Sequence, residues 1–201
     1  MESLIIVVLI LTSIVGLTFI VERGLALRWS RVMPPGVEAA LENCRNAEDV
    51  ATLKQVCLGQ PSPLSRVIIV AIEHLDWPRE ETVDALQTRA RHEIVKLERG
   101  LVVLEIIVGI APLLGLTGTI IGMISMFGSL TSSGLGDSSI FAKGISVVLY
   151  ATLLGLVVAI PSLVAWSYYN RKVERMAIEM ASLSDEFLRR QHRVRRQSAG
   201  H

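Results

Sequence analysis

The sequence predicts an all-α membrane protein with three transmembrane helices and long helices that extend into the cytoplasm. Composition is the first observation behind this prediction. Of the 201 residues, 51% are hydrophobic, and the mean hydropathy is +0.49, an excess that a soluble chain of this length rarely shows. The second observation is that three runs without a charged residue account for the excess, at residues 4–21, 106–136 and 144–170.

The first run, Leu4 to Val21, must be distinguished from a secretory signal peptide. A signal peptide has a basic leading segment, a shorter apolar core and a cleavage site of small residues. Here Glu2 precedes the run, and Glu22 and Arg23 follow it directly, so we interpret the run as a retained span. The other two runs exceed the ~20 residues that cross a bilayer, and they can tilt, kink or extend beyond the lipid.

The basic residues predict the topology. Of the 20 Lys and Arg residues, 11 lie between Arg23 and Arg99, 8 lie between Arg171 and Arg196, and the last is Lys143. Because segments rich in Lys and Arg stay in the cytoplasm, the N-terminus is predicted to be periplasmic. The predicted segments are a first transmembrane helix at residues 1–22, a cytoplasmic helical region at 23–99, a second transmembrane helix at 100–128, a periplasmic loop at 129–140, a third transmembrane helix at 141–169, and a cytoplasmic C-terminal helix with a basic tail at 170–201.

The cytoplasmic region is predicted to be helical throughout. Asn46, followed three residues later by Asp49, resembles a helix cap. Ser62 and Pro63 have the pattern of an N-cap residue followed by a proline in the first turn. The next break is at residues 76–78, and no further proline occurs before Pro112. We therefore expect one helix of roughly 50 residues, ~75 Å long, to run from this break into the second span.

The third span is expected to continue as a helix with an apolar stripe that packs on partners. The stripe consists of Val173, Met176, Ala177, Met180, Leu183, Ser184 and Phe187. Beyond it, the segment from Arg189 to Arg196 contains five arginines and His192. This basic cluster has two interpretations, a topology signal that also contacts anionic lipids or a specific ligand site. Cys44 and Cys57 lie in a reducing compartment, so we expect buried thiols and no disulfide.

The second and third spans each have one face of small, weakly polar residues. The faces comprise Ala111, Gly115, Gly118, Thr119, Gly122 and Ser125 on the second span, and Gly144, Val148, Thr152, Gly155, Ala159 and Ser162 on the third. Gly118 and Gly122 form a small-xxx-small pair, which lets helix backbones approach closely in lipid. Pro112 and Pro161 are expected to bend the helices or to free backbone carbonyls near a path for ions through the spans.

Thr119 and Thr152 have two interpretations. In the first, both hydroxyls bond back to their own helix carbonyls and the glycines serve packing alone. In the second, the threonines line a polar path, because a hydroxyl donates and accepts hydrogen bonds and can hold water or orient a carboxylate. A hydroxyl does not titrate near neutral pH, so the proton carrier must be another group. The second interpretation expects both small faces to turn toward a cavity shared by a ring of protomers.

Glu105 is the only ionisable residue between Gly100 and Gly136. A charge at the bilayer centre costs at least ~3 kcal/mol on insertion scales, so an intramembrane carboxylate is a functional candidate. Glu105 also follows Arg99 by six residues, which is ~9 Å along a helix and close to the inner interface. Interfacial anchoring and a role in ion exit are therefore both open.

The sequence contains no signature of an enzyme, a metal site or a cofactor site. The glycines of the second span lack the Gly-Lys-Ser/Thr of a phosphate-binding loop. The four histidines have no metal-ligand spacing and no Cys-x-x-Cys occurs. Basic residues are not interleaved with aromatic ones, as nucleic-acid binding would favour. We therefore predict a protein that is not an enzyme and that needs no cofactor.

Several segments together carry a family resemblance over nearly the whole chain. They are Phe19-Ile-Val-Glu-Arg23, Leu97-Glu-Arg-Gly-Leu101, Ala111-Pro-Leu-Leu-Gly-Leu-Thr-Gly-Thr-Ile-Ile-Gly122, and Gly144-Ile-Ser146 with Ala151-Thr152, Gly155-Leu156 and Ala159-Ile-Pro161. They resemble the ExbB/TolQ branch of the MotA/TolQ/ExbB proton channel family. The motifs of the second and third spans are specific in combination, although either alone is weak.

The resemblance implies a pentameric ring whose second and third spans surround the single-span helices of an ExbD/TolR-like partner. In that family the partner supplies a membrane aspartate that carries the proton, and Thr119 and Thr152 match the threonines of the pore. The proton-motive force is delivered as mechanical work to a TonB- or TolA-like protein at the bacterial inner membrane. Three spans without a large cytoplasmic insertion argue against the four-span flagellar stator branch.

One departure from the family is Val147, where many relatives carry a glutamate. If that acid relays protons in relatives, this chain functions without it, or Glu105 substitutes for it from another depth. A non-conducting oligomeric scaffold that anchors a partner protein is the alternative function. Sodium is the alternative ion, because hydroxyls and carbonyls can coordinate it as well.

Overall fold

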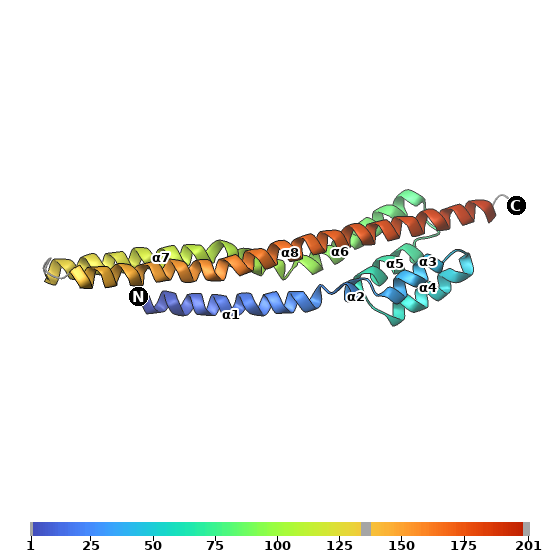
Figure 1. The fold of residues 1–201 in the computed structure, drawn as a ribbon. Helices are drawn as coiled ribbons and strands as arrows, with labels where there is room; N and C mark the ends of the chain where they lie inside the picture. The colour runs from blue at the N-terminus through green and yellow to red at the C-terminus, as the bar shows by residue number, and fades with distance from the viewer. Residues whose placement is uncertain (1, 134–137, 199–201) are drawn as a thin grey trace. The chain divides into compact units, whose positions relative to one another are not determined.

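The computed structural model describes residues 2–133 and 138–198, and within these ranges it contains helices and no strand (Figure 1). The helices are α1 (Glu2–Ala26), α2 (Trp29–Val32), α3 (Pro35–Asn43), α4 (Ala47–Gly59), α5 (Pro63–Glu73), α6 (Arg79–Glu98), α7 (Leu101–Ser133) and α8 (Ser138–Ser198). The chain divides into two compact units. The membrane unit comprises Met1–Arg23 and Gly100–Tyr169, and the polar unit comprises Gly24–Arg99 and Asn170–His201.

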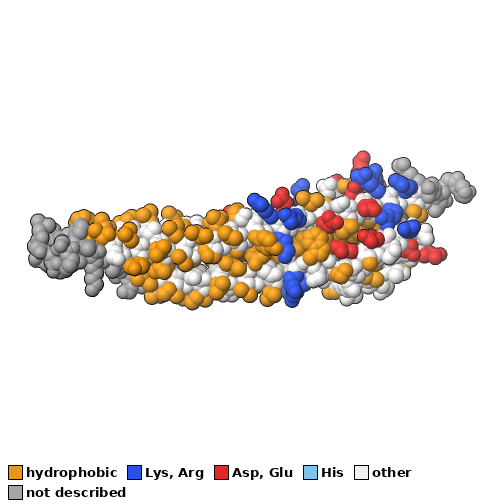
Figure 2. All heavy atoms as spheres, viewed as in Figure 1, with side chains coloured by type: hydrophobic (Ala, Val, Ile, Leu, Met, Phe, Trp, Pro, Cys, Tyr) orange, Lys and Arg blue, Asp and Glu red, His pale blue; other side chains and the backbone are white. Residues whose placement is uncertain are grey.

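Three helices are long and apolar enough to cross a membrane, which is the number predicted from the sequence. The candidate spans lie at Leu4–Ala26, Leu101–Gly128 and Val148–Val194. Hydrophobic side chains cover the visible face of the membrane unit, whereas charged side chains gather over the polar unit (Figure 2). Helices α7 and α8 also extend over most of the expected loop at residues 129–140, and residues 134–137 within it lie outside the described ranges.

The long helix expected from residue 78 into the second span is interrupted. Helix α6 ends at Glu98 and α7 begins at Leu101. The interruption contains Gly100, which is buried so closely that a Cβ atom there would overlap the Arg23 side chain. Glycine is a poor helix former, and the absence of a side chain at Gly100 leaves space that the Arg23 side chain occupies. The sequence expectation was wrong because Gly100 was not taken as a signal for a break.

Both predicted helix caps are confirmed. The Ser62 hydroxyl accepts a hydrogen bond from the Ser65 backbone N–H at 3.1 Å, and a proline follows Ser62 at the start of α5. At the start of α4, the Asp49 carboxylate accepts from the Asn46 backbone N–H at 2.9 Å as part of a capping box. Each bond satisfies an N–H group that the helix geometry leaves without an intrahelical partner.

The core of the polar unit gathers apolar side chains from α2 to α6 and from the C-terminal part of α8. Its buried members are Val32, Met33, Val37, Leu41, Cys44, Leu53, Cys57, Leu64, Val67, Ile68, Ala71, Leu75, Leu86, Met176, Met180, Phe187 and Leu188. The predicted stripe of α8 therefore packs on helices of its own chain, which differs from the expectation that it packs on partners. Burial raises the pKa of the Cys57 thiol to about 11, and both cysteines are free thiols.

A buried carboxylate joins α5 to α6 in the polar unit. The Glu93 side chain is 0% exposed and pairs with Arg66 at 2.6 Å, Arg89 at 3.0 Å and Lys96 at 3.3 Å. Burial alone would raise the pKa of Glu93, but hydrogen bonds and charge from Arg66 and Lys96 hold it below its ordinary value. Glu93 is therefore ionised at neutral pH and compensated by three cations.

Candidate functional site in the membrane unit

The candidate site lies where α7 and α8 pack against each other, and glycines bring the two backbones into contact. A Cβ atom on Gly155 would lie 2.6 Å from the Ala111 carbonyl oxygen and 3.1 Å from the Gly115 Cα. A Cβ atom on Gly115 would lie 2.9 Å from the Ala151 carbonyl oxygen and 3.1 Å from the Thr152 Cα. These separations leave no room for a side chain at either glycine.

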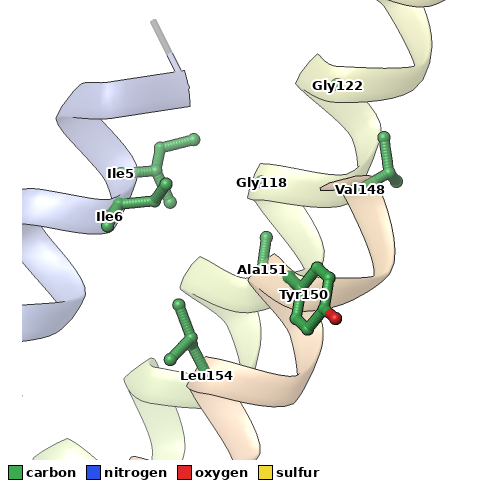
Figure 3. Close-up of a pocket in the computed structure, with 8 residues that line it drawn as sticks. All are labelled: Ile5, Ile6, Gly118, Gly122, Val148, Tyr150, Ala151 and Leu154. Carbon is green, nitrogen blue, oxygen red and sulfur yellow. The ribbon is translucent and has the colours of Figure 1, made fainter. Parts of the chain in front are cut away.

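The same packing continues toward the N-terminal part of α1. A Cβ atom on Gly118 would lie 2.7 Å from the Ala151 Cβ and 3.4 Å from Ile5. Next to this contact is a pocket of about 100 Å³ between α1, α7 and α8 (Figure 3). Its lining residues are Ile5, Ile6, Gly118, Gly122, Val148, Tyr150, Ala151 and Leu154. The pocket is apolar, and among its described lining residues only Tyr150 has a polar side-chain group, its hydroxyl.

The glycines thus pack α7 against α8 within one chain. This placement differs from the expectation that the whole small face of each span turns toward a cavity between protomers. The large aliphatic residues on the opposite face of α7 are exposed, among them Leu113, Leu116 and Ile120. In the chain as described, these aliphatic residues are the surface of α7 that is open to lipid or to other subunits.

The two predicted pore threonines lie at the edge of the glycine contact, and both are half-buried. The Thr119 hydroxyl donates to the Leu116 carbonyl at 2.7 Å. Back-bonding of this kind recurs in the membrane unit, because Thr117 donates to Leu113 at 2.8 Å. Thr152 lies beside Gly115, which is one helical turn before Thr119 on α7. The structure therefore brings the two threonines to a similar level of adjacent helices.

The hydrogen bond of Thr119 restricts what this residue can do chemically. A hydroxyl has one proton to donate and two lone pairs with which it can accept. Since the Leu116 carbonyl takes the proton, the oxygen of Thr119 is left as an acceptor. It can accept a hydrogen bond from water or from a protonated carboxyl group, and it offers no donor to an ionised carboxylate.

Glu105 is exposed on α7 and forms no ion pair with the residues that the structure describes. It precedes Pro112 by seven residues and Thr119 by fourteen. At 3.6 residues per turn, these three residues lie within about 40° of one another around the helix, and Glu105 lies ~21 Å from Thr119 along it. The seven-residue spacing of Glu105, Pro112 and Thr119 is visible in the sequence itself.

The two prolines lie inside continuous helices. Pro112 is half-buried and Pro161 is exposed. Because proline has no N–H group, the carbonyls of Val108 and Val157 lack their helical donors. Val157 is itself exposed on α8, so its carbonyl adds an acceptor near that surface.

A hydrogen bond that the sequence analysis missed ties α1 to α8. The Tyr169 hydroxyl donates to the Ile20 carbonyl at 2.8 Å, near the end of the first span. Nearby, Gly16 lies against Ser162, whose Oγ is 3.3 Å from the position of a Gly16 Cβ. A pairing between residues so distant along the chain leaves no pattern in a single sequence. Among the residues described, no group of three or more His, Cys, Asp or Glu side chains is placed to hold a metal.

These features define a multi-pass helical membrane protein with closely packed second and third spans. Comparison with known proteins specifies the class. Residues 60–182 match the model of the MotA/TolQ/ExbB proton channel family, which is more than half of the chain. The chain belongs to this family.

Individual relatives place it in the ExbB/TolQ branch. It is 33% identical over 168 residues to the putative biopolymer transport protein ExbB-like 1 of Synechocystis sp., covering 79% of this chain and 63% of that protein. It is 33% identical over 146 residues to a putative biopolymer transport protein ExbB homolog of Methanothermobacter thermautotrophicus, covering 72% and 51%. It is 27% identical over 203 residues to the Tol-Pal system protein TolQ of Haemophilus influenzae, covering 95% and 89%. The chain thus spans between half and two thirds of the length of these two ExbB-like relatives.

Proposed function

We propose that this chain is a subunit of a proton channel and motor in the bacterial inner membrane. It couples the proton-motive force to mechanical work on a TonB- or TolA-like protein. This work serves transport across the outer membrane or the maintenance of that membrane. The family match and the three spans support a channel subunit. The observation that carries the proposal is the position of Thr119, half-buried on α7 with its oxygen left as an acceptor.

In the proposed mechanism, the proton is carried by an aspartate of an ExbD/TolR-like single-span partner. Thr119 accepts a hydrogen bond from the protonated aspartic acid and gives no bond to its ionised form. Bonding to the neutral form raises the pKa of a carboxyl group, so Thr119 favours proton loading at its own level of the membrane. The proton is released when the partner moves away from this level, and Glu105, ~21 Å along the same face, is the proposed exit group.

We propose that the chain assembles into a pentameric ring, as the resemblance to ExbB and TolQ proteins implies, in which the exposed aliphatic face of α7 contacts lipid or other subunits. Leu113, Leu116 and Ile120 are each at least half exposed, and apolar side chains of this kind pack well against lipid or against other spans. In such a ring, α7 and α8 surround the partner helix. The concentration of Lys and Arg in the polar unit supports a cytoplasmic location for that unit.

A non-conducting scaffold is the second candidate function. The observation that favours it is that the glycine face is occupied within the chain and that Thr119 has already donated its proton. The scaffold and the channel differ in whether loss of the Thr119 oxygen changes ion flux.

Repeating the flux measurement with a sodium gradient in place of a proton gradient shows whether the channel conducts protons or sodium ions.

We expect Thr119→Val to reduce partner-dependent proton flux by about ten-fold or more, because the lost hydrogen bond is worth roughly 1.5 kcal/mol. Valine keeps the shape of threonine but has no oxygen. Thr152→Val is expected to act in the same direction. The measurement is proton uptake by vesicles that contain this protein with its single-span partner.

Thr117→Val is the matched control, because Thr117 is exposed and also bonds back to its own helix. Its flux should equal that of the wild type. If Thr119→Val and Thr152→Val both conduct like the wild type, the threonines are not part of the path.

A second substitution tests the proposed exit group. We expect Glu105→Gln to reduce proton flux by about ten-fold, the lower end of what a focusing charge contributes in a confined site. Glu98→Gln, an exposed glutamate at the end of α6, controls for the loss of one negative charge. Unchanged flux in Glu105→Gln would leave Glu105 as an interfacial anchor.

A further inference from the structure

A basic pocket lies in the polar unit, away from the residues assigned to the channel. It has a volume of about 320 Å³ and is lined by Arg79, Arg189, His192 and Arg193. Arg79 is the first residue of α6. The other three come from one face of α8, because residues spaced by three or four share a side of a helix. None of the described lining residues is acidic.

The positive charge of this pocket is only partly compensated. Within residues 2–133 and 138–198, Arg79 and Arg193 form neither a hydrogen bond nor an ion pair through their side chains. Arg189 pairs with Asp185 at 2.7 Å, on a surface where both side chains are largely exposed. Three guanidinium groups therefore share one carboxylate, which lies outside the lining.

The neighbouring Arg190 shows that the pocket face is distinct from the rest of the basic cluster. Arg190 donates to the Glu42 carbonyl at 2.8 Å and pairs with Glu186 at 2.7 Å. It fixes α8 to the end of α3, and these contacts account for its charge. Of the pocket arginines, Arg79 and Arg193 have no such contact among the described residues, and Arg189 has only its surface pair with Asp185.

The N-terminus of α6 adds to the positive potential. Pro78 is its N-cap residue and provides no side-chain hydrogen bond. The first N–H groups of a helix lack intrahelical partners and carry the positive end of its dipole. Glu80 and Glu81 are in the same turn, but they are exposed and do not line the pocket.

We propose that this pocket binds a phosphate-bearing anion. Guanidinium groups bind phosphate oxygens in a bidentate manner, which suits a site built from three arginines. The volume of about 320 Å³ is at the lower end of the ~300–1,000 Å³ of small-molecule sites, so a diphosphate or a phosphodiester headgroup fits. This inference rests on the polar unit alone and is independent of ion conduction.

The test is calorimetric titration of inorganic pyrophosphate into the full-length protein in neutral detergent at constant ionic strength. We expect binding by the wild type and at least about ten-fold weaker binding by the double variant Arg79→Gln with Arg193→Gln, since charge-assisted hydrogen bonds are lost. Because neither side chain forms a hydrogen bond or ion pair with the described residues, this variant should fold normally, which circular dichroism and thermal unfolding will check.

The matched control is Arg91→Gln with Arg175→Gln. These arginines are exposed, lie on α6 and α8 and do not line the pocket, so the control removes the same charge from the same helices. Its affinity for pyrophosphate should equal that of the wild type. The proposal is overturned if both double variants bind pyrophosphate as tightly as the wild type, or if both lose affinity to the same extent. Either result means that the pocket is not a specific binding site.

A second titration distinguishes the source of the phosphate group. Dihexanoyl phosphatidylglycerol is compared with dihexanoyl phosphatidylcholine, which has the same tails but no net charge. If the pocket variant weakens binding of the phosphatidylglycerol, the proposal holds with a lipid headgroup as ligand. If it weakens binding of pyrophosphate alone, the proposal holds with a soluble phosphate compound.

Discussion

Gly155→Ala is expected to destabilise the membrane unit by about 1–3 kcal/mol, the usual cost of an added methyl group in a well-packed core. The new Cβ atom would lie 2.6 Å from the Ala111 carbonyl oxygen. Because this atom belongs to the backbone of α7, it cannot rotate away as the end of a side chain does. The two helices must separate, and the contacts around Gly115 are lost with them. Gly155→Val should prevent the native packing of α7 on α8 altogether.

Gly109→Ala provides the control. Gly109 is in the same helix as Gly115, and a Cβ atom there would have no neighbour within 4 Å. Alanine is the better helix former by ~1 kcal/mol, so this variant should be as stable as the wild type or slightly more stable. Stability is measured by circular dichroism during titration of dodecyl sulfate into neutral micelles. Identical midpoints for Gly155→Ala and Gly109→Ala would contradict the backbone contact.

Gly118 allows the same contact to be tested by rescue. A Cβ atom on Gly118 would collide with the Ala151 Cβ at 2.7 Å, which is a side-chain atom. Adding Ala151→Gly to Gly118→Ala should therefore restore most of the lost stability. Adding Ala111→Gly to Gly155→Ala should restore none, because the colliding oxygen remains. This difference separates backbone contact from side-chain contact at adjacent positions of one interface.

The spans and the helix caps were predictable because they depend on short stretches of sequence. Charge-free runs identify α1, α7 and α8 as spans, and the Ser-Pro pair at residues 62–63 identifies the start of α5 by its local geometry. The apolar stripe that contains Met176 and Met180 was predictable for the same reason. What it packs against was not, because periodicity shows that a face is buried without showing which helix covers it.

The site was predictable in its residue types and not in its contacts. The small residues of α7 and α8 indicated close helix packing, but they fit a neighbour in the same chain and a neighbour in another protomer equally well. Gly100 is a further example, since the side chain that lies against it belongs to Arg23, far away in the sequence. The sequence left open whether the Thr119 hydroxyl bonds back to its own helix or lines a polar path. Only the coordinates show that it donates to the Leu116 carbonyl.

The second large effect is expected at Glu93, where Glu93→Gln should lower the free energy of unfolding of the polar unit by about 2–3 kcal/mol. Removing one partner of a buried ion pair costs ~3–5 kcal/mol, and we reduce this value because the three cations are partly exposed and screened by solvent. Glutamine keeps the shape of the side chain but leaves Arg66, Arg89 and Lys96 without a counter-charge. The Nε atoms of both arginines are already buried without an acceptor.

The pH dependence of stability provides an independent readout of the same carboxylate. The folded-state pKa of Glu93 is below the ordinary value of 4.5, so the unfolded chain binds a proton more readily than the folded one. The stabilisation is therefore complete above pH 4.5 and is lost as the pH falls through the lower, folded-state pKa. Glu93→Gln should lose this part of the acid sensitivity, so the two proteins should converge in stability as the medium becomes acidic.

Asp185→Asn is the matched control for a carboxylate that pairs on the surface. Asp185 and Arg189 are 45% and 66% exposed at their side chains, and exposed pairs of this spacing contribute only ~0.3–0.5 kcal/mol. Unfolding is followed by the fluorescence of Trp29 and Trp77, both of which belong to the polar unit. If Glu93→Gln proved no more destabilising than Asp185→Asn at neutral pH, the three cations would be compensated by solvent, and Glu93 would not join α5 to α6.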